Sequence, residues 1–205
     1  MTTTTPERVL VVACGALARE VLAIRRANRW EHVDVHCLPA KLHVTPDRIP
    51  AAVDEALAET TDRYDRVFVG YADCGTVGAL DRVLDRHRAE RLPGAHCYAV
   101  YAGLDAWEAM QDEEPGTYYL TDFLVQHFES LVVRPLGLDR HPDLRDDYFG
   151  NYCRVVYLSQ TDGPAMLEQA RACADRIGLP FEHRATGYGL LGGSLAAFAE
   201  ARSVG

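Results

Sequence analysis

The sequence predicts an α/β fold in which helices cover both faces of a mostly parallel sheet. Residues 9–13 and 67–71 are short, continuous apolar runs, which are typical of strands buried on both faces. Segments with helical periodicity separate such runs along the chain, and this alternation favours parallel strands joined by helices. Because the chain has 205 residues and a domain usually has about 100–200, we expect a single α/β domain over residues 1–205.

The first half of the chain has the more regular pattern. Apolar residues at helical spacing follow the first strand, among them Leu17, Val21 and Ile24. Pro46 suits the first turn of a later helix. The strands expected in this half cover residues 9–13, 33–38, 67–71 and 91–92. The expected helices cover residues 16–28, about 46–60 and 77–88.

The second half is more helical and less regular. Residues 122–150 form a mostly helical stretch with prolines, and Pro164 begins a helix whose apolar stripe includes Leu167, Ala170 and Ile177. The expected strands cover residues 117–120, 155–158 and a segment around Phe181. Further helices are expected at residues 104–110 and after the glycine-rich turn 186–189.

The composition indicates which binding partners and which cellular compartment the protein can have. A formal charge of −9 without a basic cluster argues against a nucleic-acid surface. No apolar run reaches the roughly 18 residues that a membrane span needs, and the first residues lack the apolar segment of an export signal. We therefore expect a cytoplasmic protein whose six cysteines stay reduced and serve as ligands, catalysts or core residues.

One pattern occurs twice and predicts an internal pseudo-repeat of residues 9–60 and 67–112. Each copy has a strand, a Cys-Gly pair, a helix, a second strand and then Leu-Pro followed by a histidine. The Cys-Gly pairs begin at Cys14 and Cys74, and the histidines are His43 and His96.

These residues also predict a metal site. The carboxyl ends of parallel strands meet at one edge of a sheet, where ligands usually bind, and Cys14, Cys74, Cys97, His43 and His96 all fall at expected strand ends. Thiolates and imidazoles suit zinc or iron. We expect zinc, bound by Cys14, Cys74, Cys97 and His96. An iron–sulfur cluster on the same three cysteines is the alternative.

Three further residues are candidates for acid–base catalysis at this edge. They are His43, Asp73 beside Cys74, and Asp122, which follows an expected strand. Asp122 has a second interpretation as a helix N-cap. A metal-free alternative makes Cys74 the nucleophile, because each Cys-Gly pair is expected at a helix N-terminus, where the thiol pKa is lowered.

The remaining cysteines and the known motifs add little to this site. Cys37, Cys153 and Cys173 occupy positions typical of packing residues. The chain has no dinucleotide-binding glycine pattern after a strand, no phosphate-binding loop and no nucleophile elbow. Nucleotide-binding and serine-hydrolase functions therefore lose support.

Six short motifs together resemble a prokaryotic family of domains of unknown function. They lie at residues 13–17, 38–43, 71–76, 96–98, 119–123 and 148–152, and include Ala-Cys-Gly-Ala-Leu, Asp-Cys-Gly-Thr and His-Cys-Tyr. Members of this family are often encoded near corrinoid-dependent methyltransferases. The resemblance therefore implies a role in methyl transfer or one-carbon metabolism, and it brings no assigned catalytic residues.

Together, the placement of the residues and the resemblance predict a metal-dependent enzyme of methyl-transfer, one-carbon or sulfur metabolism that acts on a small molecule. Zinc lowers the pKa of a bound thiol or water, so that a nucleophile forms at neutral pH. The alternatives are an iron–sulfur enzyme and a non-catalytic accessory protein that binds a corrinoid or delivers metal to a partner methyltransferase.

Overall fold

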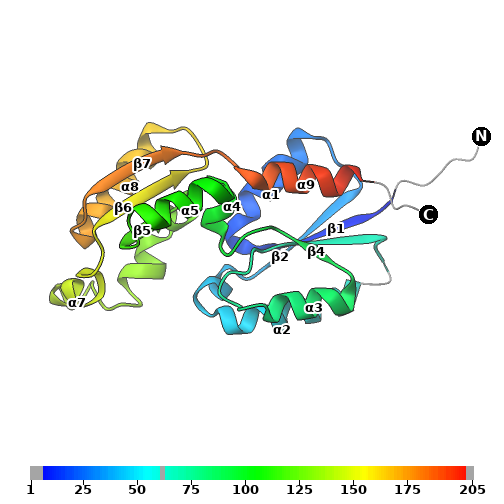
Figure 1. Cartoon of the computed structure of the whole chain (residues 1–205), viewed down its shortest axis with the longest axis horizontal. Coiled ribbons are helices and arrows are strands. Elements are labelled where there is room, and N and C mark those ends of the chain that lie inside the picture. The colour runs from blue at the N-terminus through cyan, green and yellow to red at the C-terminus, as the bar shows by residue number, and fades with distance from the viewer. Residues whose placement is uncertain (1–6, 61–62, 202–205) are drawn as a thin grey trace, which may run out of the picture. The chain divides into compact units, whose positions relative to one another are not determined.

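The computed structural model describes residues 7–60 and 63–201. The chain forms two compact units, one made of Met1–Val100 and Gly189–Gly205 and the other of Tyr101–Tyr188. Each unit has its own parallel sheet (Figure 1). The fold is α/β with parallel sheets, as the sequence predicts, but the strands form two sheets where one was expected. The single domain over residues 1–205 stays a prediction. Within the described ranges, none of the helices combines the length and apolar character needed to span a bilayer.

The sheet of the first unit has the order β2-β1-β3-β4, and all its strands are parallel. All residues of the central strand β1 are buried, which explains its continuous apolar sequence. Val9 in β1 pairs with Val33 in β2 and with Arg66 in β3, so the three strands start level with one another. The strands are β1 (Val9–Cys14), β2 (Val33–Leu38), β3 (Arg66–Gly70) and β4 (Glu90–Arg91).

Helices cover both faces of this sheet. On one face lie α1 (Ala18–Ala27) and α9 (Leu190–Glu200), and on the other lie α2 (Ile49–Thr60) and α3 (Ala79–His87), which pack against each other (Figure 1). The chain leaves β1 toward β2 on one side and leaves β3 toward β4 on the other side. The sheet therefore has a topological switch point between β1 and β3, and such a point creates a crevice outside the carboxyl ends of the strands.

Short helices complete the first unit near these carboxyl ends. They are η1 (Gly15–Leu17), η2 (Ala40–Val44), η3 (Pro46–Arg48) and the start of α4 (Cys97–Ala102). The sequence predicts a helix from residue 77, yet α3 begins at Ala79. Val77 and Gly78 have φ angles of 52° and 74°, which belong to the left-handed region and cannot continue a right-handed helix.

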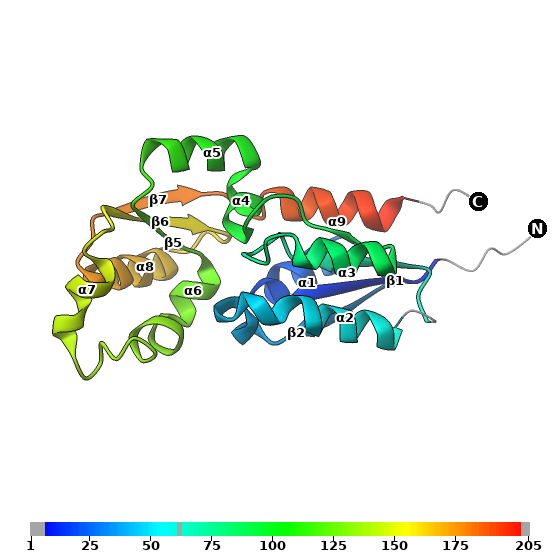
Figure 2. The ribbon, with the colours of Figure 1, turned by 60° about the horizontal axis from the view of Figure 1, so that its bottom comes forward.

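The second unit has the parallel sheet β5-β6-β7. Figure 2 shows α5 (Leu104–Glu113) on one face of this sheet, with α6 (Asp122–Gln126) and α8 (Pro164–Ile177) on the other. The strands are β5 (Thr117–Leu120), β6 (Arg154–Ser159) and β7 (Phe181–Ala185). The expected helical stretch 122–150 consists of α6, the π-helix η4 (Glu129–Val133), the 3-10 helix η5 (Pro142–Leu144) and α7 (Arg145–Phe149).

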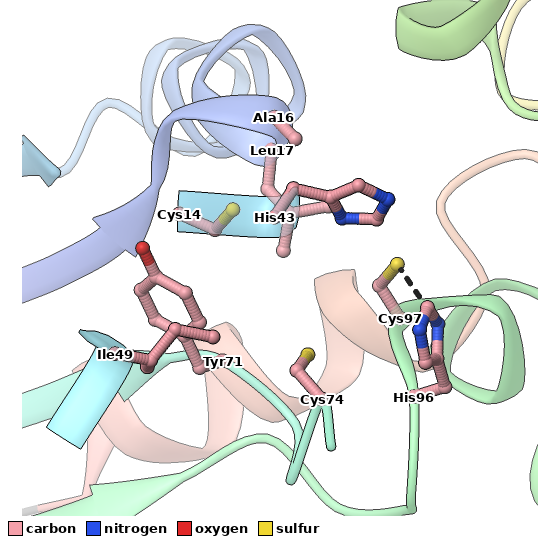
Figure 3. A pocket seen from close by; sticks show the side chains of 9 residues that line it. All are labelled: Cys14, Ala16, Leu17, His43, Ile49, Tyr71, Cys74, His96 and Cys97. Atoms are coloured by element: carbon pink, nitrogen blue, oxygen red, sulfur yellow. Dashed lines mark hydrogen bonds between the residues drawn. The ribbon is translucent and has the colours of Figure 1, made fainter. Parts of the chain in front are cut away.

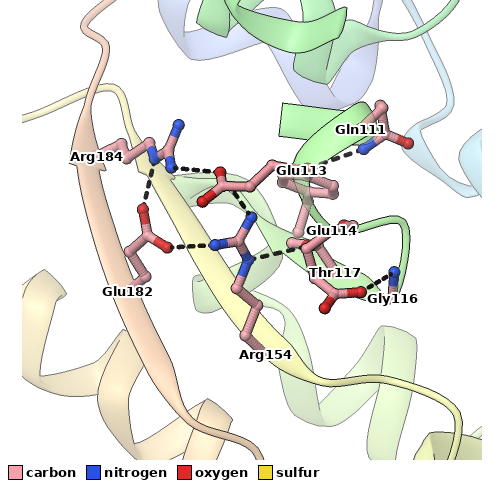
Figure 4. Close-up of polar contacts among 9 residues, drawn as sticks. Gln111, Glu113, Glu114, Gly116, Thr117, Arg154, Glu182 and Arg184 are labelled. Carbon is pink, nitrogen blue, oxygen red and sulfur yellow. Dashed lines mark hydrogen bonds and ion pairs between the residues drawn. The ribbon is translucent and has the colours of Figure 1, made fainter. Parts of the chain in front are cut away.

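A network of charged side chains ties α5 to the second sheet (Figure 4). The Arg154 guanidinium on β6 lies 3.1 Å from Glu182 on β7 and 3.3 Å from Glu113 on α5. It also donates a hydrogen bond to the Thr117 hydroxyl on β5. Arg184 donates to Glu182 at 2.6 Å. The network therefore joins all three strands to the C-terminal turn of α5.

The two predicted repeat segments share an order of elements. In each, a strand is followed by a helix and a parallel neighbouring strand: β1, α1 and β2 in one, and β3, α3 and β4 in the other. The second segment, residues 67–112, extends beyond Val100, the last residue of this part of the first unit. The pseudo-repeat itself stays a prediction.

Candidate functional site

Three cysteines and two histidines line one small cavity at the carboxyl ends of β1 and β3 (Figure 3). Its volume is about 20 Å³, counted as the space open to the centre of a water-sized sphere. That is room for about one water molecule or one ion. The lining residues are Cys14, Ala16, Leu17, His43, Ile49, Tyr71, Cys74, His96 and Cys97.

Four separate segments of the first unit bring these side chains together. Cys14 is the last residue of β1, and His43 comes from η2 after β2. Cys74 lies in the loop after β3, while His96 and Cys97 lie where the chain after β4 enters α4. The structure thus gathers all four residues that the sequence predicts as metal ligands, together with His43.

Gly15 permits the close approach of two of these segments. A Cβ atom at this position would lie 2.6 Å from the Leu38 carbonyl oxygen and 2.8 Å from the Ala40 nitrogen. Both distances are too short for a real contact and both neighbours are backbone atoms. Glycine therefore lets η1 pack directly against the chain that leads into η2, which brings Cys14 and His43 to the same cavity.

The loop after β3 is held by Asp73. Its carboxylate accepts hydrogen bonds from the Thr76 hydroxyl at 3.0 Å, the Val77 N–H at 3.1 Å and the Gly78 N–H at 2.9 Å. Burial alone would raise the pKa of Asp73, but these bonds lower it. Asp73 does not line the cavity. Asp73, which the sequence predicts as a proton-transfer residue, thus holds the turn that contains Cys74.

The thiols are in an environment that disfavours their charged form. Burial raises the pKa of Cys74 to about 11, and the Cys14 sulfur adds to this effect. Burial also raises the pKa of Cys97 well above its usual value, and the pKa of Cys14. The sequence-based expectation of a lowered Cys74 pKa is wrong, because α3 begins at Ala79 and the N–H groups of its first turn lie beyond this loop.

Cys14 fits in part the expectation that a helix N-terminus lowers the thiol pKa. It directly precedes η1, and the N–H groups of Ala16 and Leu17 lower its pKa. Burial has the larger effect, so the net shift is upward.

Both histidines are uncharged at neutral pH. Burial lowers the pKa of His96 to about 4, with a further contribution from His43. Burial likewise lowers the pKa of His43. The two rings are T-shaped with centroids 6.0 Å apart, and His96 Nδ1 lies 3.5 Å from the Cys97 sulfur. A neutral imidazole is the form that binds metal ions.

Tyr71 is a lining residue that sequence reasoning missed. Its side chain is 1% exposed, and among the described residues its hydroxyl has no hydrogen-bond partner. It lies near enough to the Cys14 sulfur to lower the pKa of that thiol. Burial, followed by Cys14, raises the pKa of Tyr71 itself. Its position directly after β3 and three residues before Cys74 was the available signal.

Asp122 belongs to the second unit and does not line this cavity. It is 1% exposed, and its carboxylate accepts hydrogen bonds from the Tyr157 hydroxyl at 2.6 Å, the Gln160 N–H at 3.0 Å and the Thr161 hydroxyl. The N-cap of α6 is Thr121, whose hydroxyl accepts from the Leu124 N–H, so the N-cap interpretation of Asp122 is wrong. Asp122 instead joins the carboxyl ends of β5 and β6.

The other cysteines lie outside the cavity. Cys173 is buried on α8, as expected of a packing residue, whereas Cys37 and Cys153 are exposed. Across residues 7–60 and 63–201, no group of three or more histidine, cysteine, aspartate or glutamate side chains already has an arrangement that holds a metal ion. The cavity side chains would therefore have to turn toward a bound ion.

Two wider cavities have a different chemistry. One of about 230 Å³ lies in the first unit and is lined by residues that include Arg66, His87 and Phe198. The other, of about 200 Å³, lies in the second unit beside Ser159 and His183, whose side chains are 2.9 Å apart. No cysteine lines either cavity.

Comparison with known proteins identifies one family. The model of the family described as "Protein of unknown function (DUF1638)" matches residues 37–195, a range that includes every cavity cysteine and histidine except Cys14. No curated protein and no solved structure matches the chain. Because the matched range covers more than half of the chain, this protein belongs to the DUF1638 family.

Proposed function

We propose that this protein is a metal-dependent enzyme of methyl-transfer, one-carbon or sulfur metabolism, with zinc bound by Cys14, Cys74, Cys97 and His96. One observation carries the proposal. Three thiols and two imidazoles from four segments of the chain line a buried cavity with room for about one ion. Sulfur and imidazole nitrogen are the ligands that zinc most often takes in proteins.

The electrostatics of the cavity are compatible with this proposal. The raised thiol pKa values mean that the empty site holds neutral thiols and neutral imidazoles at pH 7. A divalent cation would favour the thiolate over the thiol, because it stabilises the negative charge and displaces the thiol proton. The lowered imidazole pKa values help as well, since no proton has to leave His96 before it binds a metal.

The volume of the cavity favours a single ion over an iron–sulfur cluster. A cluster contains several iron and sulfide atoms, and the cavity has space for about one water-sized particle. The same three cysteines would have to move apart to admit a cluster. Zinc remains the preferred metal for this reason.

The ligand set suits sulfur chemistry. Bound zinc would supply a Lewis acid for a substrate thiol or a water molecule, which would have to displace His96 or add as a fifth ligand because the four protein ligands fill a tetrahedral shell. Three thiolates more than offset the two positive charges of zinc, so the site favours an electron-rich sulfur as the nucleophile. In a methyl transfer, the sulfur electron pair attacks the methyl carbon, and the leaving group departs with the electron pair of its bond to that carbon.

His43 is the residue best placed to take a proton. It lines the cavity beside His96, and its lowered pKa leaves it neutral and able to accept a proton at pH 7. Within the proposal it accepts the proton of the incoming thiol or water. The resemblance to a family encoded near corrinoid-dependent methyltransferases supports a methylated small molecule or a corrinoid protein as the partner.

Metal analysis of protein purified without oxygen tests the proposal. We expect about one zinc per chain in the wild type as purified and a lower zinc content in purified Cys14→Ser, Cys74→Ser and Cys97→Ser, which should bind zinc more weakly and fill only with excess metal. Cys153→Ser is the matched control, because Cys153 is exposed and lies outside the cavity. Iron and sulfide in a brown protein would indicate the cluster instead. Bound zinc with no methyl transfer would favour the accessory role, and wild type that stays metal-free after reconstitution would refute the proposal.

A further inference from the structure

The Tyr71 hydroxyl is an unexplained polar group in the wall of the cavity. It is fully buried, and no described residue offers it a hydrogen bond. Figure 3 shows its ring on the Cys14 side of the cavity, away from Cys97. A buried hydroxyl usually has a partner, and a missing partner in a native structure calls for an explanation.

The chemistry of Cys14 supplies an explanation for the missing partner of the Tyr71 hydroxyl. A neutral thiol is a weak hydrogen-bond acceptor, so a thiol at Cys14 gives the hydroxyl little to bind. A thiolate is charged, and hydrogen bonds to charged groups are shorter and roughly twice as strong. Tyr71 and Cys14 line the same cavity (Figure 3), and the Tyr71 hydroxyl lowers the pKa of the Cys14 thiol. A metal ion that held Cys14 as a thiolate would therefore give the Tyr71 hydroxyl a stronger acceptor than the neutral thiol does.

We propose that Tyr71 is a positioning residue of the metal site, and that its hydroxyl donates a hydrogen bond to the Cys14 sulfur when that sulfur is a metal-bound thiolate. This inference rests on the proposed function. The bond draws electron density from the Cys14 thiolate. Cys14 then serves as a permanent ligand with low reactivity, and the transferred group goes to the substrate sulfur.

Cobalt(II) provides the probe, because it replaces zinc in tetrahedral sulfur sites and gives thiolate-to-metal charge-transfer absorption. We compare Tyr71→Phe with the wild type and with Tyr64→Phe. The control removes a hydroxyl that donates to Asp34 and lies outside this cavity. We expect Tyr71→Phe to bind one cobalt with affinity lowered about 10-fold to 100-fold, the usual cost of removing a partner of a metal ligand. We also expect its charge-transfer band to move to lower energy.

Two further measurements separate positioning from a purely structural role. In the cobalt-loaded protein, Cys14 should be alkylated by iodoacetamide faster in Tyr71→Phe than in the wild type, with the exposed Cys37 as an internal reference. In a Cys14→Ser background, Tyr71→Phe should cause no additional band shift.

The outcomes distinguish this inference from the proposed function. Wild type that binds no cobalt and no zinc overturns both. Wild type that binds metal, with Tyr71→Phe unchanged in affinity, band energy and alkylation rate, overturns the role of Tyr71 alone. A Tyr71→Phe variant that does not fold also counts against it, since removal of a hydroxyl without a partner should not destabilise the metal-free protein.

Discussion

The affinity of the site for zinc should rise steeply with pH, because each cysteine ligand must release a proton. The pKa of Cys74 is about 11, and those of Cys14 and Cys97 are also raised. Each of the three thiols is therefore protonated in the metal-free protein throughout the range from pH 6 to pH 8. Binding to three thiolates releases about three protons, so the logarithm of the affinity rises by about 3 for each pH unit.

His96 does not add to the slope of the logarithm of the zinc affinity against pH between pH 6 and pH 8. Burial lowers the pKa of His96 to about 4, so above about pH 5 it is already neutral before the metal arrives. A solvent-exposed histidine would contribute a further proton below about pH 6.5. The predicted slope of about 3 should therefore stay constant from pH 6 to pH 8 and decrease only as the pH approaches the thiol pKa values.

Competition with a chelator of known affinity, repeated at several pH values, measures this slope. Release of protons into a weakly buffered solution with an indicator dye measures the same number independently. The variant Cys97→Ser should lower the slope by about one. A slope near zero in the wild type, or a slope unaffected by the cysteine variants, would show that thiols do not bind the metal.

Three further variants test other parts of the account. Gly15→Ala should destabilise the first unit by about 1–3 kcal/mol and weaken zinc binding, because its Cβ would meet the Leu38 carbonyl oxygen at 2.6 Å; an unchanged urea midpoint and zinc affinity would contradict this. Arg154→Met should cost about 0.2–1 kcal/mol, measured by urea unfolding, because Glu113 and Glu182 lose this partner but are partly exposed and keep Arg184; loss of zinc without loss of stability would count against a structural role. Tyr71→Phe should leave the metal-free protein at least as stable as the wild type, with the melting temperature as the readout; a clear decrease would mean that the hydroxyl has a partner without metal.

The strands were predictable because their signal is local. The apolar runs in β1 and β3 and the glycine and proline positions around them are visible in a few consecutive residues. The rule that parallel strands collect ligands at their carboxyl ends then identified the cysteines and histidines that line the cavity. That step needed only the order of elements along the chain.

Asp122 and Cys74 illustrate what local patterns do not contain. The prediction for Asp122 assumed that every strand joins one sheet, but β5 pairs with β6 in a separate unit, and only long-range packing decides this pairing. The prediction for Cys74 assumed a helix directly after β3. The left-handed φ of 51° at Cys74 belongs to a turn held by the Asp73 carboxylate, and the periodicity of the apolar residues carries no information about that turn.

Tyr71 was missed for a related reason. Its aromatic ring extends the apolar run of β3, so in the sequence it resembles a core residue. Only its burial beside Cys14 without a described hydrogen-bond partner distinguishes it from other core tyrosines.

X-ray absorption at the zinc edge identifies the atoms that bind the metal. In wild-type protein purified without oxygen, we expect about three sulfur atoms near 2.3 Å from the zinc and one nitrogen near 2.0 Å. Cys14→Ser should replace one sulfur with a lighter atom. A shell of oxygen and nitrogen alone, or the absence of bound metal after reconstitution, would contradict the assignment of Cys14, Cys74, Cys97 and His96 as the metal ligands.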